Sequence, residues 1–129
     1  MYEYQVKEVI KVVDGDTVDV VFDLGFSMFS KQRVRLDGID TPETHTTDEE
    51  EKRMGMEAKA FVENWVASHK KIKAVTSKDD KYGRILAKLY AENGGCLNEI
   101  MVAKGYAWGY DGGTKHKDFQ VLKELRAGA

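Results

Sequence analysis

The first quarter of the chain contains two apolar-rich runs of the kind that form strands. Valine, isoleucine and phenylalanine are frequent in residues 5–13 and 17–24, and Asp14-Gly15-Asp16 separates the two runs. A short Asp-Gly connection between two such runs predicts a hairpin with a tight turn. After a glycine-containing break, residues 33–36 predict a third strand.

Further along, the apolar positions take up a helical period. From Met54 to about Ser68 they recur at steps of three and four residues, which predicts an amphipathic helix with this stripe in the core. Short strands are predicted at 72–75 and 85–90, and a short helix over Leu97–Lys104. A last helix is predicted with Thr114 as its N-cap.

The predicted order of elements is three strands, a helix, two strands and two short helices. Five short strands with a helix after the third predict a small closed or nearly closed β-barrel with helices packed on it, an α+β fold. A length of 129 residues with 42% hydrophobic content predicts one domain spanning residues 1–129. The acidic run 48–51 is predicted to be a solvated loop.

Charge and cysteine content narrow the possible partners. Twenty basic and twenty-two acidic residues give a net charge of -2, so a site for a polyanion has to be a local patch. The single Cys96 excludes an internal disulfide and is expected in the core. The first residues lack the pattern of a secretory signal and no stretch has membrane-spanning length, so we expect an intracellular, cytoplasmic protein without a membrane partner. Nothing indicates an obligate protein partner, and we expect a monomer.

Two aspartates fall where strands end. Asp16 closes the first turn and Asp40 follows the third strand, so a hairpin and its neighbouring strand could bring both carboxylates to one end of the sheet. Because two ionised carboxylates repel each other, a hard cation such as Ca²⁺ would stabilise the pair. The carbonyl of Thr41 could add a third oxygen ligand, and Asp14 an outer carboxylate. Either segment taken alone is more typical of an ordinary turn or loop, and it is their combination that favours a metal site.

Three further residues near this end of the sheet have side chains that could take part in catalysis. Glu43 lies three residues after Asp40 and could act as a general base or orient a water molecule. Arg33 and Arg35 share one face of the third strand, where a guanidinium can donate two hydrogen bonds to a phosphate.

Residues 81–84, with the sequence Lys-Tyr-Gly-Arg, combine cations, an aromatic ring and a glycine turn. Such a segment suits a subsite for phosphate and base, although a polar hairpin connection has the same composition. Tyr106, Trp108 and Tyr110 could stack on bases, while the first two could equally belong to the core.

Three segments, taken in order, resemble one family. They are Val13-Asp14-Gly15-Asp16-Thr17, Arg35-Leu36-Asp37-Gly38-Ile39-Asp40-Thr41-Pro42-Glu43 and Asp80-Lys81-Tyr82-Gly83-Arg84. Together they resemble the defining segments of staphylococcal nuclease (thermonuclease) and its relatives. Asn98-Glu99 and Gly105-Tyr106-Ala107 also match, so the similarity covers roughly residues 8 to 110.

The resemblance implies a five-stranded oligonucleotide/oligosaccharide-binding barrel and Ca²⁺-dependent hydrolysis of DNA and RNA that leaves a 3′-phosphate, with single-stranded or frayed substrate preferred. The resemblance also implies a role for each site residue. Asp16, Asp40 and the Thr41 carbonyl would bind Ca²⁺; Glu43 would handle the attacking water; Arg35 and Arg84 would bind the scissile phosphate; Lys81 and Tyr82 would hold the adjacent terminal phosphate.

The chain also departs from the family pattern. The acidic run 48–51 would weaken the binding of duplex, and only Tyr110 matches a family tyrosine pair near the base. Two other interpretations compete with a nuclease: a non-catalytic nucleic-acid-binding barrel, and an adaptor for a modified peptide. The carboxylates argue against the first because they face a polyanion, and the lack of a clear aromatic cage argues against the second.

Overall fold

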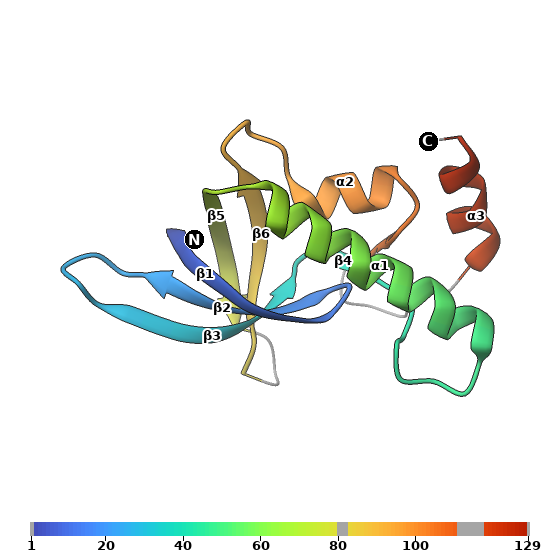
Figure 1. The fold of residues 1–129 in the computed structure, drawn as a ribbon, viewed down its shortest axis with the longest axis horizontal. Helices are drawn as coiled ribbons and strands as arrows, with labels where there is room; N and C mark the ends of the chain where they lie inside the picture. Colours follow the sequence, from blue (N-terminus) through green and yellow to red (C-terminus); the bar gives the residue numbers. More distant parts are fainter. Residues whose placement is uncertain (1, 80–82, 111–117, 129) are drawn as a thin grey trace.

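The computed structural model describes residues 2–79, 83–110 and 118–128 (Figure 1). In chain order the elements are β1 (Tyr2–Asp14), β2 (Thr17–Asp23), β3 (Phe29–Leu36), β4 (Ile39–Asp40), α1 (Glu49–Ser68), β5 (Ile72–Asp79), β6 (Ile85–Ala91), α2 (Leu97–Ala103), β7 (Trp108–Gly109) and α3 (Phe119–Ala127).

Five of the strands close into a barrel in the order β1-β2-β3-β6-β5. Their pairings are antiparallel except for that of β3 with β6, which is parallel and joins residues 34–36 to residues 85–87. A parallel pair needs a long crossover, and α1 and β5 lie within this connection. The predicted five-stranded barrel with helices is therefore confirmed.

Alternating side chains of the strands fill the barrel. Val18, Val20 and Phe22 of β2 are buried, as are Val34 and Leu36 of β3. The odd-numbered residues of these strands consequently lie on the outer face, where the register pairs Thr17 with Arg35. The apolar stripe of α1 that was predicted as core is confirmed by the burial of Ala58, Val62 and Trp65, and Cys96 is buried as expected. Burial raises the pKa of its thiol, which does not favour a reactive thiolate.

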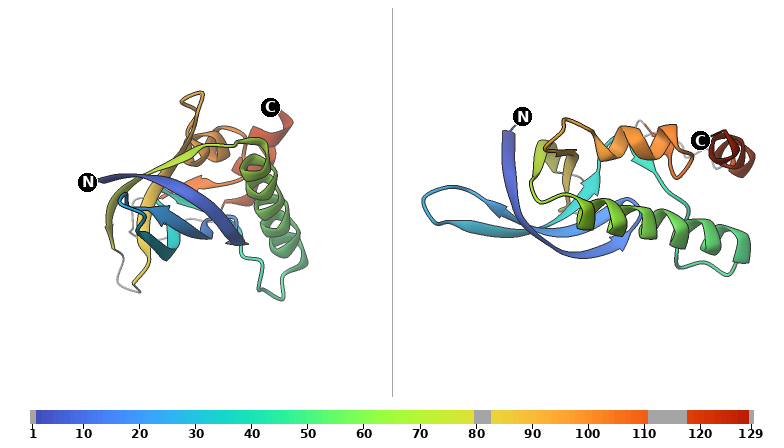
Figure 2. Two further views of the ribbon diagram at one scale, coloured as in Figure 1. Left: turned by 60° about the vertical axis from the view of Figure 1, so that its left-hand side comes forward. Right: turned by 45° about the horizontal axis from the view of Figure 1, so that its top comes forward.

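The β2–β3 hairpin extends away from the helices, on the side opposite α3 (Figures 1 and 2). Strand β3 begins at Phe29, four residues before the predicted start at Arg33. Residues 29–32 have no buried side chain, so the hydrophobic pattern did not indicate this part of the strand.

A second, smaller apolar cluster attaches α3 to the rest of the protein. Met54, Trp108 and Leu122 are buried together, with Phe119 packed against them. The indole Nε1 of Trp108 donates a hydrogen bond to the carbonyl of Asp118 at 2.9 Å. Tyr106 stacks on Phe61 with ring centroids 4.5 Å apart. Trp108 and Tyr106 thus belong to the packing, which decides between the two interpretations of these rings.

The helix starts differ from the predicted ones. Helix α1 begins at Glu49 rather than Met54, so the predicted loop at 48–51 is wrong: Asp48 is the N-cap and residues 49–51 form the first turn. Acidic side chains there interact favourably with the helix dipole. Helix α3 begins at Phe119 with Asp118 as its N-cap, and the predicted cap, Thr114, lies outside the described residues. The short β4–β7 ladder was not predicted.

The buried side chain of Asn98 connects α2 to the barrel. Its Oδ1 accepts the Leu89 N–H at 3.1 Å, and its Nδ2 donates to the carbonyls of Asp37 at 2.8 Å and Ala87 at 3.1 Å. Asp37 begins the turn between β3 and β4. One amide therefore holds a helix, a barrel strand and the turn that leads to Asp40.

Replacing this amide should destabilise the protein. Asn98→Ala leaves one donor and two acceptors buried without these bonds, and we expect the free energy of unfolding to fall by about 2 to 4 kcal/mol. Urea denaturation of the two proteins measures the difference. The exposed Asn64→Ala is the control and should change stability by less than about 0.5 kcal/mol. Equal stability of both variants would show that the network contributes little.

Candidate functional site

The turn between β1 and β2 forms one wall of the site. A Cβ atom at Gly15 would lie 2.9 Å from the Ala58 Cβ and 3.1 Å from the Thr41 side chain. Only glycine therefore lets this turn lie so close to α1 and to the segment after β4. The close contact brings Asp16 to the same place as the end of β3.

Two carboxylates from different segments converge on one guanidinium. Arg35 Nη1 lies 3.6 Å from Asp16 Oδ2, and its Nη2 lies 3.6 Å from Asp40 Oδ1. The three side chains are only 10%, 14% and 4% exposed, in the order Arg35, Asp16, Asp40. The structure thus brings together three of the residues that the sequence singled out, and it does so in an environment where charges are weakly screened.

Strand pairing and local hydrogen bonds fix each member of this group. Arg35 pairs with Thr17 across β2 and β3, and Asp40 pairs with Trp108 across β4 and β7. Asp16 Oδ2 accepts the backbone N–H of Thr41 at 3.3 Å, and its Oδ1 accepts the Thr17 hydroxyl at 3.1 Å. Thr41 is itself buried, and its carbonyl follows Asp40 directly in the chain.

The next residues carry Glu43 and are held from two sides. The backbone N–H of Glu43 donates to Glu51 Oε2 at 3.2 Å, which connects the loop to the first turn of α1. The hydroxyl of Thr44 donates to Asp14 Oδ1, which connects the loop to the end of β1. Asp14, predicted as an outer carboxylate of a metal site, therefore has a bond that positions this loop.

Gly55 allows α1 to approach the same loop closely. A Cβ atom there would lie 2.5 Å from the Glu43 carbonyl oxygen and 2.7 Å from that of Pro42. Real Cβ atoms do not approach oxygen so closely, so the helix and the loop can occupy these positions only with glycine. The backbone of Glu43 is thereby fixed against a helix.

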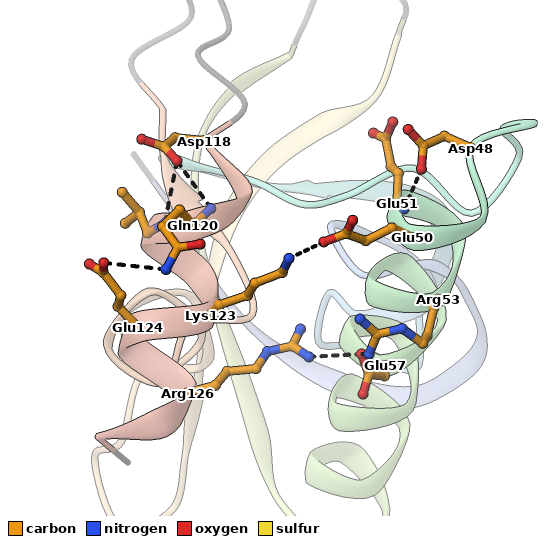
Figure 3. A network of polar contacts seen from close by, with 11 residues as sticks. Asp48, Glu50, Glu51, Arg53, Glu57, Asp118, Gln120, Lys123, Glu124 and Arg126 are labelled. Carbon is orange, nitrogen blue, oxygen red and sulfur yellow. Dashed lines mark hydrogen bonds and ion pairs between the residues drawn. The ribbon is translucent and has the colours of Figure 1, made fainter.

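Helix α3 contacts the outer side of α1 through ion pairs (Figure 3). Lys123 pairs with Glu50, and Arg126 Nη1 lies 2.9 Å from Glu57 Oε1. The Arg126 guanidinium also donates to the Gly105 carbonyl at 3.0 Å and lies 4.3 Å from the centroid of the Tyr106 ring. These contacts attach α3 to the helix that holds the Glu43 loop.

Glu51, Gly55 and Thr44 are functional contacts that were not predicted from the sequence. A signal for Glu51 was available: Asp48 followed three residues later by a glutamate resembles a capping box and marks the start of a helix. The structure has half of that arrangement, with Asp48 accepting the Glu51 N–H at 3.0 Å while the Glu51 carboxylate reaches Glu43 instead. No sequence signal pointed to Gly55 or Thr44, because their roles depend on contacts between distant segments.

The other predicted site residues are distributed around this centre. Arg84 is half-buried and directly precedes Ile85, which pairs with Val34 next to Arg35. Tyr110 is half-buried and its N–H donates to the Gly38 carbonyl at 2.8 Å, so it extends the β4–β7 ladder that contains Asp40. Lys81 and Tyr82 lie outside the described residues.

Arg33 shares the outer face of β3 with Arg35 but has another partner. Its Nε and Nη2 donate to Asp19 at 2.8 and 3.1 Å, and its side chain is 52% exposed. The hydrogen bond from Arg33 lowers the pKa of Asp19, against the opposing effect of partial burial. Arg33 is thus a surface ion pair, and Arg35 is the arginine of the candidate site.

A search of the described residues finds no group of three or more histidine, cysteine or acidic side chains arranged to hold a metal ion. In the same residues, no helix is both long enough and apolar enough to cross a bilayer. The candidate site therefore consists of two converging carboxylates, a guanidinium and a neighbouring loop with one further carboxylate.

Comparison with known proteins identifies similar chains. Endonuclease YhcR of Bacillus subtilis (strain 168) is 31% identical over 123 residues, which cover 86% of this chain and 10% of that protein. An uncharacterized endonuclease of Escherichia coli is 34% identical over 105 residues, covering 80% of this chain and 60% of that protein. The uncharacterized protein MJ1439 of Methanocaldococcus jannaschii is 32% identical, with 91% of this chain and 65% of that protein covered.

This chain thus spans between a tenth and about two thirds of the length of these relatives. The family model described as staphylococcal nuclease homologue matches residues 33–129. That range begins within β3 and contains Arg35, Asp40, Glu43 and Arg84. The chain therefore belongs to the family of staphylococcal nuclease homologues.

Proposed function

We propose that this chain is a Ca²⁺-dependent phosphodiesterase that hydrolyses DNA or RNA, prefers single-stranded or frayed substrate and leaves 3′-phosphate ends. The observation that carries the proposal is the convergence of Asp16 and Asp40 on Arg35, beside the loop that holds Glu43. The names of two relatives, which include the word endonuclease, support it. A non-catalytic barrel would bind a polyanion better without these carboxylates.

The donor atoms of the site fit a hard divalent cation. Two carboxylates carry one more charge than the Arg35 guanidinium neutralises, and both are largely buried, so an added cation would be stabilised between them. Asp16, Asp40 and the Thr41 carbonyl would hold Ca²⁺, with water completing a coordination that needs six or more oxygens. When bound, the ion would supply positive charge beside the scissile phosphate.

The side chains of the site would bind the phosphate, position the attacking water and hold the rest of the substrate. Arg35 and Arg84 would donate hydrogen bonds to the phosphate oxygens, which gain negative charge in the transition state. The Glu43 carboxylate would accept a proton from the attacking water or orient it, and its fixed backbone would limit how far it can move. Lys81, Tyr82 and Tyr110 would bind the neighbouring phosphate and base.

The first test is cleavage itself. We expect the purified protein to degrade single-stranded DNA or RNA with added Ca²⁺ and to stop when a chelator is added. Glu43→Gln should lower kcat by about 10² or more, because general-base catalysis contributes that much. The exposed Glu124→Gln on α3 is the matched control and should retain the wild-type rate. Cleavage that survives the chelator would contradict the role of the metal.

The second test is the stability of the metal-free protein. Arg35→Gln leaves two largely buried carboxylates without their cation, and unfolding free energy in chelator should fall by about 3 kcal/mol. Ca²⁺ should then raise the melting temperature of this variant more than that of the wild type. Arg33→Gln, which breaks an exposed ion pair on the same strand, should cost about 1 kcal/mol or less. Melting temperatures insensitive to Ca²⁺ would exclude a calcium site here.

The third test concerns the contact between α1 and the Glu43 loop. Alanine has a higher helix propensity than glycine, yet a Cβ atom at position 55 would displace the Glu43 carbonyl. We expect Gly55→Ala to lower kcat by up to about 10², the effect of a displacement near 1 Å. Gly128→Ala is the control, because its Cβ would have its nearest contact at 3.7 Å. Unchanged kcat in Gly55→Ala would mean that the loop position does not matter for turnover.

A further inference from the structure

A hollow of about 330 Å³ opens beside the loop that carries Glu43. Its lining includes Thr44, His45 and Thr46 of that loop, together with Lys52 and Lys59 of α1. Two ammonium groups, the Thr46 hydroxyl and an imidazole can donate hydrogen bonds, whereas the Thr44 hydroxyl already donates to Asp14, and the lining contains no carboxylate. The hollow is therefore a concave surface of positive charge on a protein whose net charge is -2.

The arrangement of α1 explains why the hollow is cationic in spite of the acidic run. Lys52, Met56 and Lys59 are spaced by four and three residues and so share one face of the helix. Glu50 and Glu57 point instead toward Lys123 and Arg126 of α3 (Figure 3). Glu50 and Glu57 are thus directed toward α3, while Glu49, three residues before Lys52, is exposed to solvent.

Two further carboxylates of the acidic run 48–51 accept backbone N–H groups: Glu51 accepts that of Glu43, and Asp48 accepts that of Glu51. A second hollow, of about 370 Å³, shares Lys59 with the first and continues along β1. It adds the ammonium group of Lys11, while Glu63 contributes one carboxylate. The positive surface therefore extends from the Glu43 loop toward the middle of β1.

We propose that the first hollow binds the phosphodiester backbone of the substrate strand, at least one nucleotide away from the bond that is cleaved. The proposal rests on the proposed function, because it takes the strand to be held at Glu43, the residue next to Thr44. The volume is at the lower end of that found for small-molecule sites, which suits a single nucleotide. The apolar side chains of Val13 and Met56 would contact its sugar or base.

The chemistry of the lining favours a nucleic-acid strand over a protein. Lysines and hydroxyls contact phosphate oxygens without regard to sequence, and affinity from such contacts depends strongly on salt. Only two of the lining residues, Val13 and Met56, are apolar, which is too few for the apolar centre of a protein interface. The same chemistry would also accept free phosphate or a free nucleotide, and a comparison of substrate lengths separates these ligands from a strand.

The experiment compares a long and a short substrate. We expect Lys52→Glu/Lys59→Glu to raise KM for a single strand of about 12 nucleotides at least about tenfold, a length within the site sizes of single-strand-binding barrels. KM and kcat for a dinucleotide should change less than about twofold. The slope of log affinity against log salt should fall by about 0.7 for each phosphate that the variant leaves unneutralised. Lys70→Glu/Lys71→Glu, an equal charge change at residues outside the hollow, is the control.

The outcomes separate this proposal from the proposed function. Equal loss on both substrates, or no loss on either, would overturn it and leave the nuclease standing. If the wild type cleaves neither substrate, anisotropy of the labelled long strand in chelator decides. The proposal is supported if Lys52→Glu/Lys59→Glu binds the strand more weakly than the wild type while the control variant does not. It is overturned if this variant binds as the wild type does, or if the wild type does not bind the strand. Inorganic phosphate provides a further test. If phosphate inhibits dinucleotide cleavage by the wild type but not by Lys52→Glu/Lys59→Glu, the hollow binds free phosphate, and this result would also contradict a strand site.

Discussion

The contact of Arg35 with Asp16 and Asp40 is the constraint on which the rest of this structure depends. Carboxylates that are less than 15% exposed are costly unless a cation neutralises them, and the three groups come from the β1–β2 turn, β3 and β4. Bringing these segments together requires a turn without a side chain at Gly15 and a short ladder between β4 and β7. The tight turn at Gly15 and the short β4–β7 ladder therefore hold the two carboxylates beside the guanidinium.

Three faces of helix α1 contact three different parts of the protein. One face enters the core with Ala58, Val62 and Trp65. Another carries the acidic residues that α3 contacts through ion pairs, and the third lines the cationic hollow. Glu50 and Glu57 therefore face α3, while the lysines at 52 and 59 face the hollow beside the Glu43 loop.

Much of the fold could be predicted from local pattern, because the alternation in β2 and the helical period in α1 report burial directly. The members of the candidate site could be named from the sequence, since Asp16, Asp40 and Glu43 are acidic residues placed in a predicted turn or just after a predicted strand. What holds the site could not be predicted. Gly55 and the Thr44–Asp14 bond matter only through partners distant in sequence. The early start of α1 was predictable in principle from Asp48 and Glu51, whereas residues 29–32 of β3 bury nothing and left no hydrophobic signal.

The parallel pairing of β3 with β6 closes the barrel over only three residue pairs, and one of these joins Arg35 to Leu86. The partners are about fifty residues apart in the chain, with α1 and β5 between them. Contacts of such sequence separation form slowly in folding, after local hairpins and helices. Of the two arginines of the proposed site, Arg35 lies in β3 and Arg84 directly precedes β6, the two strands that this pairing joins. A molecule that has formed its hairpins and helices but not this pairing has most of its secondary structure, yet these two arginines are not held together. We therefore expect the candidate site to be among the last features of the chain to form.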